Sequence, residues 1–506
     1  MSKNSDHSIN QAISKNLART SVRAGLINVG SQGFAVALQL LSTVVLARLL
    51  TPAAYGTIGM VAAIIAFASL FKDLGLSTAT IQRKDLTHDQ VSVMFWANIL
   101  AGFGLTFLLS VCSPLVANFY NRPELVWVTV ALSINILIVS LGAQHSALLT
   151  RNMRFKHLAI SRLSGALITF IVALLAALDD WAHWALVAGT LAGSFAQVFL
   201  LWSFNAWRPG LPKRGTGAIS MLKYGLNLTG FDLVNYFSRN LDNILIGRVW
   251  GAQSLGYYSR AYSLLLFPIQ NIRGPITSVA MPAMSRLQDE PERFRAYYSQ
   301  VLSILGMLTM PISAFCFVSS DLIIETLLGS QWLPAANIAK WLAFASFLQP
   351  VAGVFGMVLM ALGLANRHLR CGLISAILLS LTFLLSVRYG VETLAICYAI
   401  SGYVLFVPIF LYAAKGTGIR LGHFIRGVWR PALASVFAAL SLFLVKSMII
   451  QPFVLMSLIL NLSLFGLVYL ILFVVLPGGA NDLRDLYHRL IDGIRKQKPS
   501  QKAEGE

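Results

Sequence analysis

The sequence predicts an all-α membrane protein with about fourteen transmembrane helices. Composition provides the first two observations behind this fold class. Hydrophobic residues make up 57% of the 506 residues and only 12% are charged, against about 25% in soluble domains. The mean hydropathy of +0.70 is too high for a soluble enzyme or a disordered chain. The third observation is a series of apolar segments, because a spanning helix needs about 20 mostly apolar residues.

These apolar segments define the predicted spans in chain order. They cover residues 22–48, 56–76, 91–118, 126–147, 158–178, 182–203, 219–248, 256–282, 297–319, 338–364, 370–387, 391–413, 431–448 and 453–477. The last two are separated only by Ile449–Pro452 and could instead form one broken re-entrant segment.

The charge balance predicts the orientation of the chain. Lys and Arg total 39, Asp and Glu total 20, and the net charge is +19. In a soluble protein this excess would suggest a nucleic-acid partner, but in a membrane protein basic residues collect on cytoplasmic loops. If the N-terminus is cytoplasmic, roughly thirty of the 39 basic residues lie at cytoplasmic ends of spans. We therefore expect both termini in the cytoplasm and no nucleic-acid partner.

The sequence offers no motif for a metal or a cofactor. The four cysteines, Cys112, Cys316, Cys371 and Cys397, lie in apolar segments without metal-ligand spacing, as small buried residues do. The chain has no HExxH, P-loop or dinucleotide fingerprint. Residues 481–498 alternate apolar and charged residues at helical spacing, which favours an amphipathic helix on the cytoplasmic face. Docking of a partner protein is the alternative role for this tail.

An internal repeat at an offset of 200 residues organises the spans. It aligns Gly30 with Gly230 and Arg48 with Arg248, so span 7 corresponds to span 1. Chance similarity between apolar helices is less favoured, because the matches fall on Gly and Arg. An even number of spans per copy predicts two six-helix lobes in the same orientation, a parallel repeat, followed by two extra helices. The predicted organisation is a cytoplasmic segment 1–21, an N-lobe 22–203, a cytoplasmic loop 204–218, a C-lobe 219–413, spans 13 and 14 at 431–477, and a tail 478–506.

Polar residues recur on one face of predicted span 7. They are Asp232, Asn235, Tyr236, Arg239, Asp242 and Asn243, spaced as on one side of a helix. Gln32 and Gln39 of span 1 align with two of them in the repeat. Ionisable groups at membrane depth are expected to face protein or a water-filled cavity. The functional hypothesis is a polar cavity between two lobes, and the alternative is a buried ion pair of Arg239 with Asp232 or Asp242.

Span 8 is the other predicted element with polar residues at membrane depth. It carries Arg260, Gln270 and Arg273. Pro268, Gly274 and Pro275 are expected to interrupt it, which is tolerated where the freed backbone groups line a cavity. We therefore expect span 8 to be a moving element.

At this point the sequence resembles a known family. A basic residue and Gly open span 1, LLSTVVLARLLTPAAYGTIGM follows at Leu40–Met60, and LFKDLGLSTATIQRKDLT follows at Leu70–Thr87. These blocks are similar to those of the polysaccharide transporter family, the Wzx-type flippases of the multidrug/oligosaccharidyl-lipid/polysaccharide superfamily. The resemblance covers roughly residues 20–420 and includes the two-lobe plan.

The resemblance implies a multi-pass protein of the bacterial inner membrane and no enzyme activity. Its expected role is to flip an undecaprenyl-diphosphate-linked oligosaccharide repeat unit by alternating access, for exopolysaccharide or lipopolysaccharide assembly. Implied partners are this lipid-linked substrate, membrane lipid, and the polymerase and chain-length or export proteins of the pathway. Basic lumen residues of the family correspond to Arg23, Arg48, Lys223, Arg239, Arg248 and Arg273.

Physical chemistry is compatible with this role. A diphosphate needs Arg or Lys in a desolvated cavity, and a sugar headgroup needs Asn, Gln and Tyr. Coupling to H⁺ or Na⁺ stays open, with Asp232 and Asp242 as the candidate acids.

Three other functions compete with the flippase. A cation-coupled multidrug extruder of the same superfamily would prefer acidic cavity residues for cationic drugs, whereas bases here at least equal acids. A membrane glycan polymerase or ligase usually carries a large outer loop, and this sequence predicts none. An amino-acid-type secondary transporter is the remaining alternative.

Overall fold

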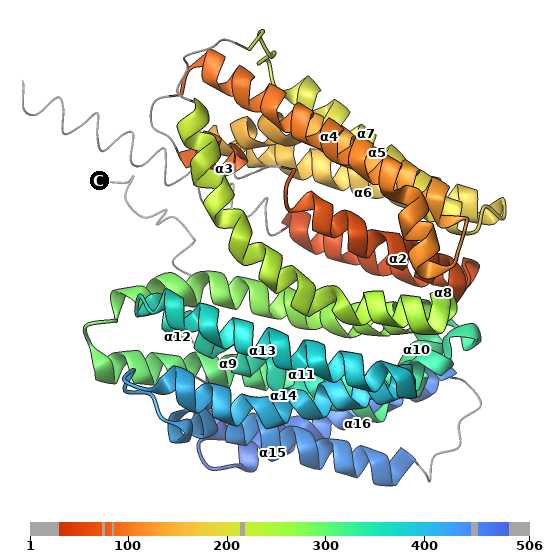
Figure 1. Cartoon of the computed structure of the whole chain (residues 1–506). Coiled ribbons are helices and arrows are strands. Elements are labelled where there is room, and N and C mark those ends of the chain that lie inside the picture. The colour runs from red at the N-terminus through yellow and green to blue at the C-terminus, as the bar shows by residue number, and fades with distance from the viewer. Residues whose placement is uncertain (1–29, 73–75, 83–85, 213–217, 447–453, 485–506) are drawn as a thin grey trace, which may run out of the picture. The chain divides into compact units, whose positions relative to one another are not determined.

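The computed structural model describes residues 30–72, 76–82, 86–212, 218–446 and 454–484, without the side chains of 82, 218–235, 237–239 and 446. Every regular element in this part of the chain is a helix, which confirms the all-α fold class (Figure 1). The first is Gly30–Leu49. The others are α2 (Pro52–Ser69), α3 (Leu76–Gln82), α4 (His88–Tyr120), α5 (Leu125–Arg151), α6 (Phe155–Leu178), α7 (His183–Phe204), α8 (Ala218–Arg286), α9 (Pro291–Val318), α10 (Ser320–Leu328), α11 (Pro334–Ala352), α12 (Val354–Ala361), α13 (Ala365–Ser386), α14 (Val391–Ala414), α15 (Leu421–Lys446) and α16 (Val454–Val475), with short 3₁₀ turns η1 (Ser330–Trp332) and η2 (Val387–Tyr389).

Twelve helices among the described residues are long and apolar enough to cross a membrane. These helices correspond to twelve of the fourteen predicted spans. The two predicted spans without a counterpart, the seventh and the eighth, both fall on α8. The polar residues of α8 lower its mean hydropathy, so the total of fourteen stays a prediction. The final pair forms two helices, α15 with 26 residues and α16 with 22. Each helix exceeds the length of about 20 residues that a span needs. The pair therefore forms two separate helices and not one re-entrant segment.

Local sequence signals explain where several helices begin. Thr51 accepts a hydrogen bond from the Ala54 amide, and Pro52 occupies the first position of α2, where its missing N–H costs nothing. Thr87 and Gln90 form a reciprocal capping box at the start of α4. Asn121 ends α4 in the left-handed region, with φ 54°, which asparagine tolerates better than most residues.

Gly251 breaks α8 into two arms. Its φ of 80° and ψ of −177° lie in a region open essentially only to glycine. The neighbouring Trp250 indole donates to the Val387 carbonyl at 2.6 Å. The first helix ends before Thr51, so the 200-residue offset aligns the break at Thr51 with the break at Gly251.

The interruption expected near Pro268 and Pro275 is wrong, because α8 remains helical through both prolines. Side chains in this stretch donate to backbone carbonyls: Asn271 to Phe267 at 2.8 Å and Ser278 to Pro275 at 2.8 Å. These side chains add hydrogen bonds to the backbone of the helix close to both prolines.

The chain divides into two compact units, Met1–Tyr236 and Phe237–Glu506. In the first unit, α4 packs on α5, and α6 packs closely on α7 (Figure 1). Glycines permit the second contact: a Cβ added to Gly193 would overlap Thr169 Oγ1 and lie 2.6 Å from the Gly165 carbonyl oxygen. Gly189, one turn earlier, would likewise meet the Thr169 carbonyl oxygen at 2.7 Å. Small residues at such spacing let membrane helices approach closely.

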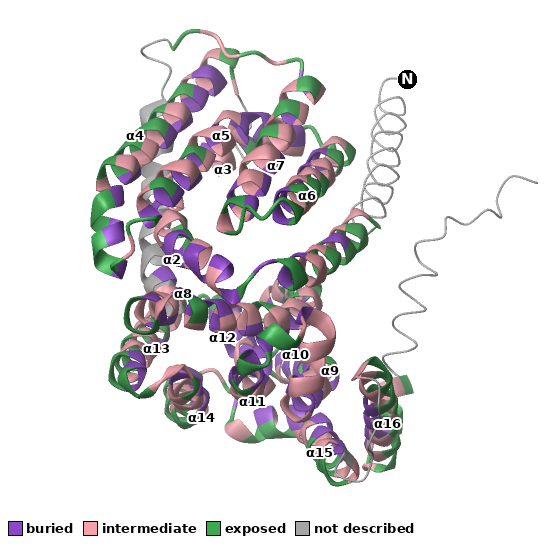
Figure 2. Cartoon of the chain, turned by 90° about the vertical axis from the view of Figure 1, so that its right-hand side faces the viewer, coloured by how far each residue is buried: buried purple, intermediate pink, exposed green. Residues whose placement is uncertain are grey.

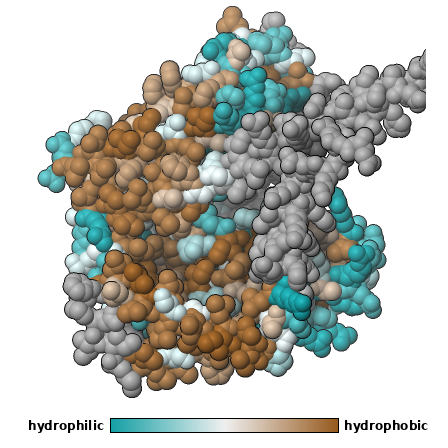
Figure 3. Space-filling model, turned by 180° about the vertical axis from the view of Figure 1, so that it is seen from behind, coloured by the Kyte–Doolittle hydropathy of each residue, from teal (hydrophilic) through white to brown (hydrophobic). Residues whose placement is uncertain are grey.

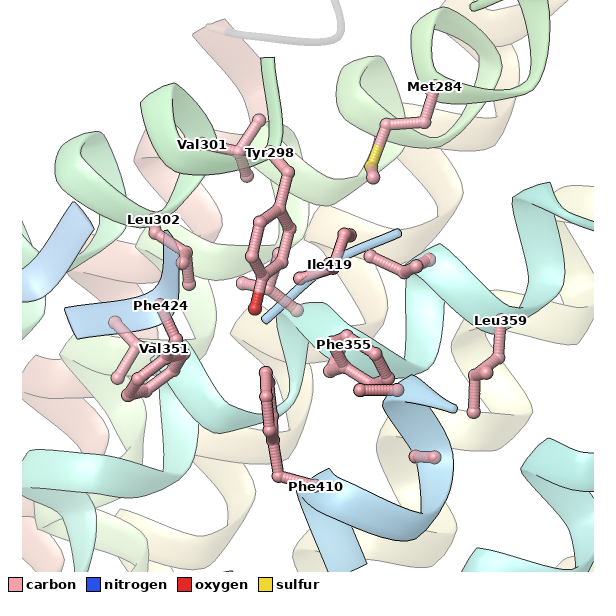
Figure 4. Packing of buried hydrophobic residues seen from close by; sticks show 14 of the residues in the cluster. Met284, Tyr298, Val301, Leu302, Val351, Phe355, Leu359, Phe410, Ile419 and Phe424 are labelled. Atoms are coloured by element: carbon pink, nitrogen blue, oxygen red, sulfur yellow. The ribbon is translucent and has the colours of Figure 1, made fainter. Parts of the chain in front are cut away.

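In the second unit, α9, α11, α14 and α15 surround an apolar core. Tyr298 and Phe355 lie at its centre with ring centroids 6.1 Å apart, and Phe410 packs 4.6 Å from Phe355 (Figure 4). Exposed residues lie along the other faces of α13, α14 and α15 (Figure 2). Many of them are large and apolar, and Figure 3 shows broad hydrophobic areas with hydrophilic residues toward the edges. Lipid is the solvent that such faces require.

Candidate functional site

The predicted site residues divide by what the structure describes. Arg23 lies outside the described residues, and so does most of the predicted amphipathic tail. Lys223, Asp232, Asn235 and Arg239 have helical backbone within α8, but their side chains are not described. The side chains that are described are Gln32, Gln39, Arg48, Tyr236, Asp242, Asn243, Arg248, Arg260, Gln270 and Arg273.

The first helix carries three of the predicted polar site residues at its surface. Gln32, Gln39 and Arg48 are all exposed. The Thr43 hydroxyl on the same stripe donates a hydrogen bond to the backbone carbonyl of Gln39, at 2.8 Å. Exposed amides and an arginine on an apolar membrane helix need a polar surrounding. Arg248, which aligns with Arg48 in the repeat, is also exposed at the end of the first arm of α8.

Tyr236 belongs to the packing of the first unit. Its hydroxyl donates to the Ala63 carbonyl of α2, and its ring centroid lies 5.8 Å from that of Phe67. The side chain is buried. Tyr236 therefore joins α8 to α2, and this contact occupies its hydroxyl.

Asp242 is a carboxylate buried within an apolar helical unit. One of its oxygens accepts a hydrogen bond from the Tyr258 hydroxyl at 2.7 Å, and the other accepts from the Asn243 amide at 2.8 Å. The bond from Tyr258 links the two arms of α8 across the Gly251 break, whereas the bond from Asn243 lies within the first arm. A buried carboxylate is costly unless hydrogen-bonded, so these partners explain how Asp242 is tolerated there.

Tyrosines extend the polar surroundings of Asp242 toward other helices. Tyr258 is fully buried and stacks on Tyr262 with an interplanar angle of 13°. It also lies within electrostatic range of Tyr398 on α14. The Tyr398 hydroxyl accepts a hydrogen bond from the Gln349 amide of α11 at 2.5 Å. The second unit thus holds a group of polar side chains on α8, α11 and α14.

Arg273 lies close to this group, at the break between α11 and α12. A Cβ added to Gly353 would lie 2.6 Å from a guanidinium nitrogen of Arg273. The absence of a side chain at Gly353 leaves room for the guanidinium. Gly353 is one helical turn beyond Gln349, which places Arg273 near the polar group. Arg260 is half-buried and Gln270 is exposed.

A family model for polysaccharide biosynthesis proteins matches residues 45–337, more than half of the chain. The chain belongs to this family. The match confirms the resemblance found in the sequence, and it includes α2 to α8 in full.

Similarity to individual proteins agrees with the family. The chain is 29% identical over 370 residues to the teichuronic acid biosynthesis protein TuaB of Bacillus subtilis, covering 72% of this chain and 77% of TuaB. It is 26% identical over 328 residues to the lipopolysaccharide biosynthesis protein WzxC of Escherichia coli, covering 64% of this chain and 67% of WzxC. Among solved structures, the lipid II flippase MurJ in an inward closed conformation matches with a TM-score of 0.73 at 14% identity, covering 92% of this chain and 99% of MurJ.

This member of the polysaccharide biosynthesis family also has a polar contact in its first unit that sequence reasoning missed. The Thr80 hydroxyl lies 2.8 Å from Gln144 Oε1, and the Arg151 guanidinium donates to the Thr80 carbonyl at 2.9 Å. These two contacts join α3 to α5. Thr80 and Gln144 are fully buried. The sequence signal for this contact was a single polar residue within an apolar segment. It could not reveal the partners, because Gln144 and Arg151 lie 64 and 71 residues from Thr80 in the chain.

Metal binding finds no support in the described residues, where no group of three or more His, Cys, Asp or Glu side chains could hold an ion. The four cysteines are free and lie apart on α4, α9, α13 and α14.

The hydrogen bond from Tyr258 to Asp242 gives a stability prediction. Tyr258→Phe leaves a carboxylate oxygen without its partner, so the free energy of unfolding should fall by about 1–3 kcal/mol. Thermal unfolding of the purified protein in detergent measures the change. Tyr257→Phe is the matched control, because the Tyr257 hydroxyl accepts only from Gln253 at 3.1 Å in a more exposed position. Equal unfolding midpoints for the two variants would contradict a stabilising role for the Asp242 contact.

Proposed function

We propose that this protein is a flippase for a lipid-linked oligosaccharide, moving undecaprenyl-diphosphate-linked repeat units from the cytoplasmic to the periplasmic leaflet of the bacterial inner membrane. The observation that carries the proposal is the family match over residues 45–337. Relatives are named for teichuronic acid and lipopolysaccharide biosynthesis. The fold is that of MurJ, which is named as a lipid II flippase.

The distribution of polar groups supports transport of an amphipathic anion. Exposed Gln32, Gln39 and Arg48 on the first helix, with the predicted polar face of α8, supply amides for sugar and guanidinium groups for diphosphate. The apolar outer faces leave the polyprenyl tail in the bilayer. We propose alternating access of the two predicted lobes as the transport cycle, with both termini in the cytoplasm.

In this proposal the membrane potential supplies the driving force for outward movement of the substrate. Moving negative charge outward is favoured by about 2.3 kcal/mol per charge per 100 mV when the interior is negative. Counter-transport of H⁺ or Na⁺ would add to this, with Asp242 and Asp232 as the groups to test. The polymerase and the chain-length or export proteins of the same pathway are the proposed partners.

Deletion of the gene tests the function directly. We expect lipid-linked repeat units to accumulate at the cytoplasmic leaflet and the surface polymer to disappear, because the headgroup cannot cross hydrocarbon unaided. The fraction of repeat units that a lectin or a glycosidase can reach in inverted and in right-side-out vesicles measures the leaflet in which they lie. The intact gene on a plasmid should restore both values. Normal polymer combined with increased sensitivity to cationic drugs would instead favour the multidrug extruder.

A further inference from the structure

A cavity of about 320 Å³ lies at one end of α13 and α14, apart from the residues assigned to transport. Its size is at the lower limit of small-molecule sites, which are about 300–1,000 Å³. We name it the headgroup pocket. It is lined by Gly363, Leu364, Asn366, Arg367, Arg370, Tyr412 and Lys415.

The headgroup pocket is shaped by the turn between α12 and α13. Gly363 has a φ of +71°, which glycine adopts without strain. The Gly363 and Leu364 amides donate to the Met360 and Leu359 carbonyls, at 3.1 and 2.8 Å, and so end α12. The half-buried Arg367 donates to the carbonyls of Ala413, at 3.3 Å, and Lys415. Arg367 thereby holds the start of α13 against the end of α14.

The charge of the pocket selects an anion. Three of its lining residues are basic and none is acidic. The ion pairs found among described residues involve other arginines, Arg122, Arg293 and Arg430. Arg370 and Lys415 are exposed at the pocket, so their charges can meet a ligand. The N-terminus of α13 adds a favourable dipole, and Arg and Lys are both phosphate-binding residues in proteins.

Apolar stripes lead away from the pocket along both helices. On α13, Arg370 is followed on the same face by Ile374, Ile377 and Leu381, with exposed fractions of 44%, 66% and 51%. On α14, Tyr412 is preceded by the exposed Leu411, Val407 and Val404. A soluble anion would make no use of these stripes, whereas acyl chains would cover them. The basic end and the apolar stripes together match the two parts of one lipid.

We propose that the headgroup pocket binds the phosphate of an anionic phospholipid, with its acyl chains along the exposed faces of α13 and α14. Basic pockets between transmembrane helices recognise lipid headgroups in this way. The positive-inside distribution predicts that this end faces the cytoplasmic leaflet. The binding is separate from transport, so its failure would leave the proposed flippase function intact.

Native mass spectrometry of the full-length protein in detergent tests the proposal. Phosphatidylglycerol is added in competition with phosphatidylethanolamine, and the bound lipids are counted. We expect the wild type to retain phosphatidylglycerol several-fold more, and R370Q/K415Q to lose this preference. Arg367 is left intact because it supports the fold. R388Q/R426Q is the matched control: it removes the same charge at exposed positions outside the pocket and should behave as wild type.

Folding of the variant is checked by its unfolding midpoint without added lipid, which should equal that of the wild type. Phosphatidylglycerol should then raise the midpoint of the wild type and of R388Q/R426Q, but not that of R370Q/K415Q. Equal retention of phosphatidylglycerol by all three proteins would overturn the proposal. Displacement of the lipid by inorganic phosphate would assign the pocket to a free anion. Preferential retention of undecaprenyl diphosphate would assign it to the transported lipid, and both results would also overturn the proposal.

Discussion

Gly193→Val is expected to lower the free energy of unfolding by about 3 kcal/mol or more, the upper range for overpacking a close contact. A Cβ at this position would overlap Thr169 Oγ1 and crowd the Gly165 carbonyl oxygen at 2.6 Å. The Thr169 side chain can rotate, but the Gly165 carbonyl belongs to helix α6 and cannot move alone. The whole of α7 must therefore shift away from α6, which removes contacts along both helices.

A graded series separates this effect from the loss of glycine itself. Gly193→Ala should be milder, because only the Cβ is added. Gly104→Val is the matched control, since a Cβ at Gly104 of α4 meets nothing within 4 Å. Yield in the membrane and thermal unfolding in detergent measure the series. A Gly193→Val protein as stable as Gly104→Val would show that α6 and α7 are not held at the spacing described here.

Arg239→Ala is expected to abolish polymer production while leaving the protein in the membrane. Arg239 lies on the predicted polar face of α8, near the middle of its first arm. A guanidinium there can bind a diphosphate through two parallel hydrogen bonds in a site of low dielectric. Asp232→Ala on the same face should also abolish polymer, because it removes a predicted partner or coupling group. Polymer on the cell surface and protein in isolated membranes are measured together.

Two comparisons make this second result specific. Arg239→Lys keeps the charge but loses the planar geometry, so partial polymer production is expected. Arg122→Ala removes the same charge from an exposed arginine that pairs with Glu124 at 3.0 Å in a loop, and should leave polymer unchanged. Normal polymer from both Arg239→Ala and Asp232→Ala would remove the α8 polar face from the transport site.

Hydropathy predicted most of the helices because lipid imposes a simple rule on each span separately. Twelve predicted spans coincide with helices that meet this rule. The rule fails at α8, where polar residues lower the hydropathy, and at the start of α15, which begins ten residues before the predicted span, at Leu421. Helix ends depend on capping and packing, so polar first turns extend a helix without an apolar signal.

The sequence predicted the contacts of the candidate site less completely than it predicted the helices. The sequence placed Asp242 on a polar face, and the structure gave it Tyr258 as a partner 16 residues away. Trp202 and Trp207 make a second contact that sequence spacing does not reveal. Both indoles pack on the buried His145, with ring centroids 4.3 and 5.2 Å from the imidazole. The two lobes and the lumen residues stay predictions.

The sequence alone determined that the chain is a helical membrane protein, which family it resembles, and which end of each span is rich in bases. These properties are sums over local residues, so composition and order are enough to reveal them. Only the tertiary structure decided that Gly193 must be glycine, that Tyr236 is used in packing, and that Arg370 and Lys415 share a pocket with apolar stripes. Each of these depends on atoms brought together from separate helices, and the spacing of residues in one helix carries no information about its neighbour.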